Sequence, residues 1–305
     1  MKTKSITFVG DSITSGTGAT AGNSFASLCK ANFPKMFPEY SWTVSNLGKP
    51  GATSDFWLNG TGVCEGAVRQ REQKIPALCT ANNFRWIEDF PPKAYLKEAA
   101  DITVFMLGTN DCAPGGIPLY DFTIDMLEML VSLVTLGKQV VLMTPPALNE
   151  KYWTGGRNNK VLAEYADAIR NLAAANKLPL VDNFATFQAR SGKINDYFQP
   201  NKINVNGTDL DDGIHPNDAG HKLIYDALLA SIKTILSTPV PKPPVKGAGI
   251  SPASAALLGS MVFCTSESPV SRRAALKYFA GMLTLAMIPD SSASFKKLVQ
   301  LKVEG

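Results

Sequence analysis

A serine near the start of the chain has neighbours typical of a reactive side chain. Ser12 follows Asp11 in the segment ITFVGDSITSGTG (6–18), directly after a short apolar run that predicts a strand. A serine hydroxyl becomes a useful nucleophile only when a base takes its proton and a third group orients that base. The first question is therefore whether the chain offers such partners or whether Ser12 only follows the end of a strand.

The chain has two histidines, so the search for a base is short. In DLDDGIHPNDAGH (209–221), Asp212 lies three residues before His215. This spacing lets the carboxylate accept a hydrogen bond from imidazole Nδ1, which leaves Nε2 free to take the Ser12 proton. His221 falls inside a predicted helix, and we interpret it as a helix-surface or helix-packing residue rather than a catalytic one.

Two loops that follow predicted strands carry neutral hydrogen-bond donors. Gly51 lies in SNLGKPGATS (45–54), and Asn110 lies in LGTNDCAPGG (107–116). Together with the N–H of Ser12, the Gly51 N–H and the Asn110 amide predict an oxyanion hole. Loss of one such donor typically costs about 2.7–4 kcal/mol of transition-state stabilisation.

Four segments, GDSIT, NLGKPGAT, GTND and DGIHP, occur in this order within residues 5–236. They resemble the signature blocks of the SGNH (GDSL-type) hydrolases, with Ser12, Gly51, Asn110 and His215 where that family has its Ser, Gly, Asn and His. The resemblance implies a flavodoxin-like three-layer α/β/α sandwich with a five-stranded parallel sheet of order 2-1-3-4-5. It also implies hydrolysis of esters or thioesters through an acyl-serine, without a metal or cofactor.

Each of these residues also has a simpler explanation. Ser12 could cap a helix, Gly51 could supply a positive φ, and Asn110 could belong to a turn. These explanations do not account for four matches in one order, so the catalytic interpretation is favoured. Gly48 competes with Gly51, but only Gly51 lies five residues after Asn46, as in the N-x-x-x-x-G spacing of the family.

Two other chemistries fit the sequence less well. A phosphate-binding loop of the G-x-x-x-x-G-K-[ST] type would need a lysine that is missing after the first strand. The acidic loop before the last helix holds Asp209, Asp211, Asp212 and His215, which could gather a divalent ion. Adjacent aspartates usually point apart, however, and Ser12 would then lack a base. We therefore expect no metal and no cofactor.

The sequence says less about the substrate. Trp57 and Trp153 fall in long connections near the expected mouth of the site, where aromatic rings could stack on sugars. The segment 144–156 is the expected rim after the fourth strand. No continuous apolar tunnel for a long acyl chain is evident, so we favour short acyl groups, first of all O-acetyl groups on carbohydrate. The alternatives are lysophospholipase, thioesterase or acyltransferase activity at the same site, or a non-catalytic carbohydrate-binding module.

Strands and helices that alternate along the chain must position these residues. Apolar runs predict strands at 5–10, 42–47, 101–108, 138–145 and 178–183. Helical spacing of apolar residues predicts helices at 122–138, 158–177 and 217–236. This alternation predicts a parallel sheet with helices on both faces, and ligands of such sheets bind at the carboxyl ends of the strands.

The 305 residues, 45% of them hydrophobic, suffice for one sizeable core plus an appendage. We expect a hydrolase domain over 1–236, a Pro-rich linker over 237–249 and a partly helical tail over 250–305. The connection 48–100 is longer than a plain crossover and is expected to form a lid or wall.

Charge and cysteine content restrict the partners and the compartment. The net charge is +4, with no basic stripe among the first 236 residues, so no nucleic-acid partner is expected. Five scattered cysteines predict a reduced chain, although Cys64 and Cys79 could pair in an oxidising compartment. No apolar run approaches the roughly 20 residues of a membrane span.

The ends of the chain bear on localisation. The first strand begins almost at once, which leaves no room for a signal peptide and predicts a cytoplasmic protein. Residues 271–288 of the tail resemble a twin-arginine export signal, but such signals are read at N-termini. This tail could instead contact a partner or a membrane surface.

Overall fold

The computed structural model describes residues 1–60, 63–65, 85–87, 93–97 and 100–237 of the chain. The predicted tail, nearly all of the predicted linker and the pairing of Cys64 with Cys79 lie outside these residues. So does much of the long connection that was expected to form a lid or wall.

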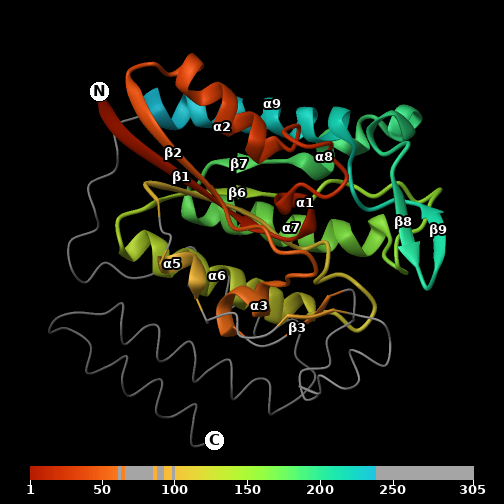
Figure 1. Ribbon diagram of the computed structural model, residues 1–305. Coiled ribbons are helices and arrows are strands. Elements are labelled where there is room, and N and C mark those ends of the chain that lie inside the picture. The colour runs from red at the N-terminus through yellow and green to blue at the C-terminus, as the bar shows by residue number, and fades with distance from the viewer. Residues whose placement is uncertain (61–62, 66–84, 88–92, 98–99, 238–305) are drawn as a thin grey trace, which may run out of the picture.

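A five-stranded parallel sheet forms the centre of the fold (Figure 1). Its strands, in spatial order, are β2 (Tyr40–Asn46), β1 (Lys2–Gly10), β5 (Ile102–Met106), β6 (Gln139–Met143) and β7 (Leu180–Val181). Counted along the chain within this sheet, the order is 2-1-3-4-5, and the predicted sheet is confirmed. Every residue of β5 is buried because the strand is central and both of its faces are covered.

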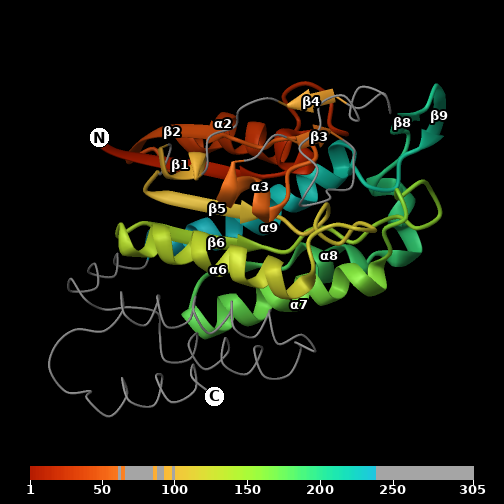
Figure 2. The same cartoon turned by 90° about the horizontal axis from the view of Figure 1, so that it is seen from below.

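Helices cover both faces of the sheet (Figures 1 and 2). On one face lie α2 (Phe25–Met36) and α9 (Asp218–Ser237), which pack against each other. On the other lie α3 (Ser54–Asn59), α6 (Leu119–Thr135) and α7 (Asn159–Asn176). The three predicted helices correspond to α6, α7 and α9, whereas the sequence analysis did not identify α2.

The carboxyl ends of the strands meet at one edge of the sheet, where the short elements gather (Figure 1). These include α1 (Ser12–Ser15), which directly follows β1, and the hairpin of β8 (Lys202–Val205) and β9 (Thr208–Asp211). The remaining elements are β3 (Val63–Glu65), β4 (Arg85–Ile87), α5 (Ala94–Lys97), α8 (Asn183–Gln188) and the 3₁₀ helix η1 (Ser191–Tyr197). Ser12, Gly51 and Asn110 follow β1, β2 and β5 at this edge, whereas Asp212 and His215 lie between the β8–β9 hairpin and α9.

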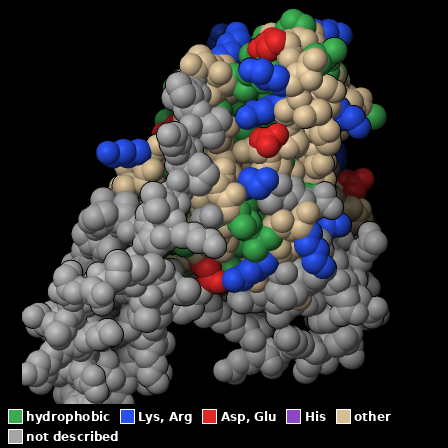
Figure 3. Space-filling view, turned by 90° about the vertical axis from the view of Figure 1, so that its left-hand side faces the viewer, with side chains coloured by type: hydrophobic (Ala, Val, Ile, Leu, Met, Phe, Trp, Pro, Cys, Tyr) green, Lys and Arg blue, Asp and Glu red, His purple; other side chains and the backbone are tan. Residues whose placement is uncertain are grey.

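On the face of the molecule seen in Figure 3, charged side chains of both signs are visible among the described residues. Basic side chains on the face shown in Figure 3 are interspersed with acidic and uncharged ones. Among the helices within the described ranges, none combines the length and the apolar character needed to cross a membrane.

Candidate active site

The turn from β1 into α1 holds the Ser12 hydroxyl at the edge of the sheet. Asp11 is the N-cap of α1, and its Oδ1 accepts a hydrogen bond from the Ile13 N–H at 2.9 Å. The capping role considered for Ser12 therefore belongs to Asp11. Burial raises the pKa of Asp11, against the opposing effects of the Ile13 N–H and the charge of His215. Ser12 is the first helical residue, so its N–H has no acceptor within the helix.

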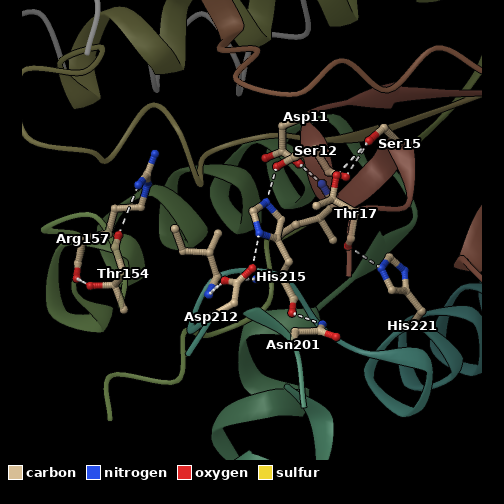
Figure 4. A network of polar contacts seen from close by, with 12 residues as sticks. Asp11, Ser12, Ser15, Thr17, Thr154, Arg157, Asn201, Asp212, His215 and His221 are labelled. Carbon is tan, nitrogen blue, oxygen red and sulfur yellow. Dashed lines mark hydrogen bonds and ion pairs between the residues drawn. The ribbon is translucent and has the colours of Figure 1, made fainter. Parts of the chain in front are cut away.

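Ser12, His215 and Asp212 form one continuous chain of hydrogen bonds (Figure 4). The distance from Ser12 Oγ to His215 Nε2 is 2.8 Å, and that from His215 Nδ1 to Asp212 Oδ2 is 2.7 Å. With the proton on Nδ1, the imidazole donates to the carboxylate and accepts from the serine hydroxyl. The structure thus brings together the three residues that the sequence selected, 203 positions apart at the widest.

Backbone groups keep the carboxylate of Asp212 oriented and ionised. Its Oδ1 accepts hydrogen bonds from the N–H of Ile214 at 2.7 Å and of His215 at 3.1 Å. Burial by itself would raise the pKa of Asp212, but the hydrogen bond and charge of His215, with these two N–H groups, lower it below its ordinary value. The carboxylate therefore stays charged and can stabilise a protonated imidazole.

Gly51 lies in a tight turn whose hydrogen bond is made by the N–H of Ala52 and not by that of Gly51. Ala52 N–H donates to the Lys49 carbonyl at 3.0 Å, and Gly51 has a φ of 77°. Proline followed by glycine at the two central positions is the signature of a type II turn, in which the glycine supplies the positive φ. The segment Lys49–Pro50–Gly51–Ala52 thus has the residues that this turn requires.

Gly48, the competing glycine, has a packing role. Its N–H donates to the Asn46 side chain at 2.9 Å and is therefore already engaged. A β-carbon at Gly48 would lie 2.2 Å from Ser15 N and 2.6 Å from the carbonyl carbon of Thr14. The absence of a side chain lets this loop lie directly against α1.

Asn110 lies next to the Gly51 turn. Its Nδ2 donates one hydrogen bond to the Ala52 carbonyl at 3.1 Å, which leaves its second N–H for another acceptor. The neighbouring Asp111 is fully buried and accepts from the N–H groups of Ser54 and Gly108 at 2.8 and 3.1 Å. Burial raises the pKa of Asp111 to about 6 despite these donors. Its carboxylate ties the two loops that carry Gly51 and Asn110.

Arg157, which was not predicted as a site residue, lies beside Thr154 in Figure 4 and contacts Asn110 of the site. Its Nη2 donates to Asn110 Oδ1 at 2.9 Å, its Nε to the Thr109 carbonyl at 2.7 Å and its Nη1 to the Thr154 carbonyl at 3.1 Å. The sequence signal that could have indicated Arg157 is the pair Gly155–Gly156 directly before it. In the structure both glycines have a positive φ. Such a pair allows the chain to turn sharply, but it does not reveal which loop the arginine meets.

The two tryptophans expected to contact substrate occupy different environments. Trp57 has no exposed surface, and its Nε1 donates to the Gly10 carbonyl at 3.2 Å. It is a core residue of α3, and the expectation that it lines the mouth of the site is wrong. Trp153 is partly exposed, and its backbone pairs with that of Asp212 next to the site. Trp153 therefore lies beside the site, and its contact with substrate stays a prediction.

The second histidine and the remaining acidic residues have separate partners. His221 is fully buried in α9, stacks on Phe25 and contacts the Thr17 carbonyl through Nε2 at 3.2 Å. Asp211 pairs with Lys202, and Asp209 accepts from Asn204 at 2.7 Å. Within the part of the chain that the structure describes, no three His, Cys, Asp or Glu residues are grouped to hold a metal ion.

Comparison with known proteins finds relatives in sequence and similar solved structures. A curated relative, the isoamyl acetate-hydrolyzing esterase of Saccharomyces cerevisiae, is 30% identical over 175 residues, which cover 52% of this chain and 68% of the relative. Similar solved structures include a lipase/acylhydrolase from Enterococcus faecalis, with 21% identity, a TM-score of 0.53 and coverage of 79% of this chain and 99% of that one. An acetylxylan esterase from Geobacillus stearothermophilus has 18% identity, a TM-score of 0.50 and coverage of 75% and 94%.

These solved structures show the fold, and the family is identified from sequence. The family model of the GDSL-like lipases and acylhydrolases matches residues 8–223, which include all four of the blocks described above. The chain therefore belongs to the GDSL-like lipase/acylhydrolase family and is a carboxylic ester hydrolase.

Proposed function

We propose that this esterase hydrolyses short-chain acyl esters, acetyl esters first, through an acyl intermediate on Ser12. The observation that carries the proposal is the continuous hydrogen-bonded chain from the Ser12 hydroxyl through His215 to Asp212. This is the arrangement that a neutral hydroxyl needs in order to lose its proton as it attacks a carbonyl carbon.

The reaction has two halves. In the first, Ser12 Oγ attacks the ester carbonyl while its proton moves to His215 Nε2, and His215 then protonates the departing alcohol. In the second, the same imidazole takes a proton from water, which attacks the acyl-serine, and then returns that proton to Ser12 Oγ as the acyl–oxygen bond breaks and the acid leaves. Asp212 holds the imidazole by its Nδ1–H in both halves and stabilises the imidazolium that forms.

Each tetrahedral intermediate carries a negative oxygen that needs hydrogen-bond donors. We assign this role to the Ser12 N–H, the Gly51 N–H and the second N–H of the Asn110 amide. The start of α1, the Lys49–Ala52 turn and the Asn110–Ala52 contact support this assignment. Such donors are already oriented before the reaction begins, so the site does not have to reorganise as the negative charge develops. This is why they lower the barrier strongly.

The relative at 30% identity supports an acetyl group on the acid side, because its name records hydrolysis of isoamyl acetate. For the alcohol side, carbohydrate is the first candidate from the sequence, and partly exposed Trp153 offers an aromatic surface beside Asp212. The burial of Trp57 removes the second stacking surface that this preference assumed. A small branched alkyl alcohol, as in isoamyl acetate, is therefore the second candidate.

The test is hydrolysis of 4-nitrophenyl acetate, butyrate and octanoate by the wild type and Ser12→Ala. We expect acetate to react fastest and the variant to lose at least about 10³-fold in kcat while keeping its melting temperature, because removal of the nucleophile leaves only binding and the oxyanion hole. A folded Ser12→Ala protein with wild-type activity would contradict the acyl-serine. Isoamyl acetate and a peracetylated xyloside, compared by kcat/KM, then decide between the two alcohol classes, and product analysis with an added sugar acceptor detects any transfer.

A further inference from the structure

We propose that Arg157 is a positioning residue that sets the orientation of the Asn110 amide and strengthens it as an oxyanion donor. This inference rests on the proposed function, because it concerns the donor group of that same site. It assigns a role to a side chain outside the four sequence blocks, on the segment between β6 and α7.

The hydrogen bonds around Asn110 allow only one orientation of its amide. Arg157 Nη2 can only donate, and it faces Asn110 Oδ1 at 2.9 Å. The Ala52 carbonyl can only accept, and it faces Asn110 Nδ2 at 3.1 Å. A flipped amide would place N–H against N–H at one end and oxygen against oxygen at the other. The Arg157 contact therefore directs the NH2 group toward the Gly51 turn.

The contact also changes the strength of the donor. A hydrogen bond from a guanidinium to an amide oxygen is charge-assisted, and it polarises the amide so that its N–H groups donate more strongly. Three buried carboxylates, those of Asp11, Asp111 and Asp212, lie close enough to influence Arg157. Burial lowers the pKa of Arg157 and these carboxylates oppose that effect, so the guanidinium stays charged.

Arg157 is itself held in place by the backbone. Its Nε and Nη1 donate to the Thr109 and Thr154 carbonyls, and the Thr154 hydroxyl donates to the Arg157 carbonyl at 2.7 Å. Gly155 has a φ of 61°, and a β-carbon there would lie 2.6 Å from Arg157 Nη1. The sequence Thr-Gly-Gly-Arg thus builds a compact loop whose guanidinium has a fixed direction.

The same loop reaches the other half of the site. Trp153 N–H donates to the Asp211 carbonyl, and Gly213 N–H donates to the Trp153 carbonyl, both at 2.9 Å. Residues 153–157 therefore contact the Asp212 loop through the backbone and Asn110 through Arg157. This loop connects the acid–base residues to the oxyanion donor.

The experiment is a double-mutant cycle on kcat and KM for 4-nitrophenyl acetate. Arg157→Gln and Arg157→Lys are each made in the wild type and in Asn110→Ala. Enzyme concentrations are chosen so that the hydrolysis rate of Asn110→Ala exceeds the rate measured with Ser12→Ala. In the wild type, we expect Arg157→Gln to lower kcat about 10- to 100-fold and to change KM less than about 3-fold. In Asn110→Ala, we expect the same substitution to lower kcat less than about 3-fold, because the donor that it positions is absent. Arg157→Lys keeps a charge, but its three N–H donors lie on one nitrogen and cannot reach the three acceptors that Nε, Nη1 and Nη2 serve, so an intermediate loss is expected.

The matched control is Arg190→Gln, which removes an arginine after α8 whose Nη1 donates to the Thr186 carbonyl at 2.7 Å. It should retain wild-type kcat. Equal losses from Arg157→Gln in both backgrounds, or no loss in the wild type, would overturn the positioning role. If Arg157→Gln does not fold, Arg157→Lys in the same two backgrounds gives the same decision.

A second readout separates positioning from general damage. The affinity for a trifluoromethyl ketone, which forms an oxyanion adduct with the nucleophile, should fall with Arg157→Gln by about the factor lost in kcat/KM. An unchanged affinity would count against the proposal. If Ser12→Ala keeps its activity, the proposed function itself fails. If that variant is inactive but the cycle shows no coupling, only the role of Arg157 fails.

Discussion

At the scale of single residues, the two histidines of the chain are specialised by their surroundings. His215 is hydrogen-bonded to a carboxylate on one side and to a hydroxyl on the other. His221 is buried against Phe25, and its partners are a backbone carbonyl and a backbone N–H. The first environment favours a proton carrier, whereas the second favours a neutral ring.

This difference predicts an acid-sensitive contribution to stability from His221. Burial lowers the pKa of His221 from 6.5 to about 4. The unfolded chain therefore binds a proton on this side chain at higher pH than the folded chain does. The contribution is fully present above about pH 6.5 and is lost as the pH falls toward 4, up to about 3 kcal/mol in total.

The measurement is the free energy of unfolding from urea denaturation between pH 4 and 7, for the wild type and His221→Gln. Glutamine can keep a donor and an acceptor but does not titrate in this range. We expect the variant to be less stable at pH 7 and to lose less stability on acidification. Parallel pH profiles of the two proteins would show that His221 does not carry the effect.

At the scale of elements, α1 is short and depends on the loops packed against it. Its four residues begin with Ser12, and its first turn is held by Asp11. The loop after β2 lies against it through Gly48, and the Asn46 side chain donates to the Thr14 carbonyl at 2.8 Å. The position of the Ser12 hydroxyl is thus fixed largely by a neighbouring loop.

Gly48→Ala tests this dependence. The added methyl group would clash with the backbone of Thr14 and Ser15, which cannot rotate away as a side chain could. We expect a loss of about 1–3 kcal/mol of stability and a fall in kcat, because α1 must shift and carry Ser12 with it. Thermal unfolding and 4-nitrophenyl acetate kinetics measure the two effects.

The matched control is Gly192→Ala, since a β-carbon at Gly192 would meet nothing within 4 Å. It should leave both stability and kcat close to wild type. Wild-type behaviour of Gly48→Ala would mean that the loop moves aside without disturbing the serine.

At the scale of the whole molecule, the sheet, its helices and the candidate site all lie within residues 1–237. The family match ends at residue 223, and α9 ends at Ser237. The strands that carry the site are covered on both faces by helices of this same segment (Figure 2). The segment therefore holds the core and the chemistry together.

A chain of residues 1–240 should fold on its own and hydrolyse 4-nitrophenyl acetate with kcat/KM within about 3-fold of the full chain, because it includes all of the sheet and the site. The check is a cooperative thermal transition together with steady-state kinetics of both proteins. Aggregation or loss of activity in the shorter chain would mean that residues beyond 240 stabilise the catalytic domain, contrary to the domain boundaries expected from sequence.

Much of the fold could be predicted because its signals are local. Buried strands appear in the sequence as short apolar runs, and α6, α7 and α9 appear as apolar residues at helical spacing. The sheet and these helices could therefore be predicted. The helix α2 was missed, and its sequence includes Pro34, which ordinarily argues against a helix interior. Here the proline lies close to the end of the helix at Met36, where the fold tolerates it.

The sequence by itself determined which residues would meet at the nucleophile, because each lies in a short motif next to a strand end or a helix start. Asp212 and His215 are three residues apart, and the parallel sheet brings Ser12 to the same edge. Only the tertiary structure decided that Trp57 is buried and that Arg157 reaches Asn110, 47 residues away. The direction of a loop side chain follows no periodic pattern and depends on which distant backbone groups surround it. Packing therefore decides it, and the order of residues along the chain does not.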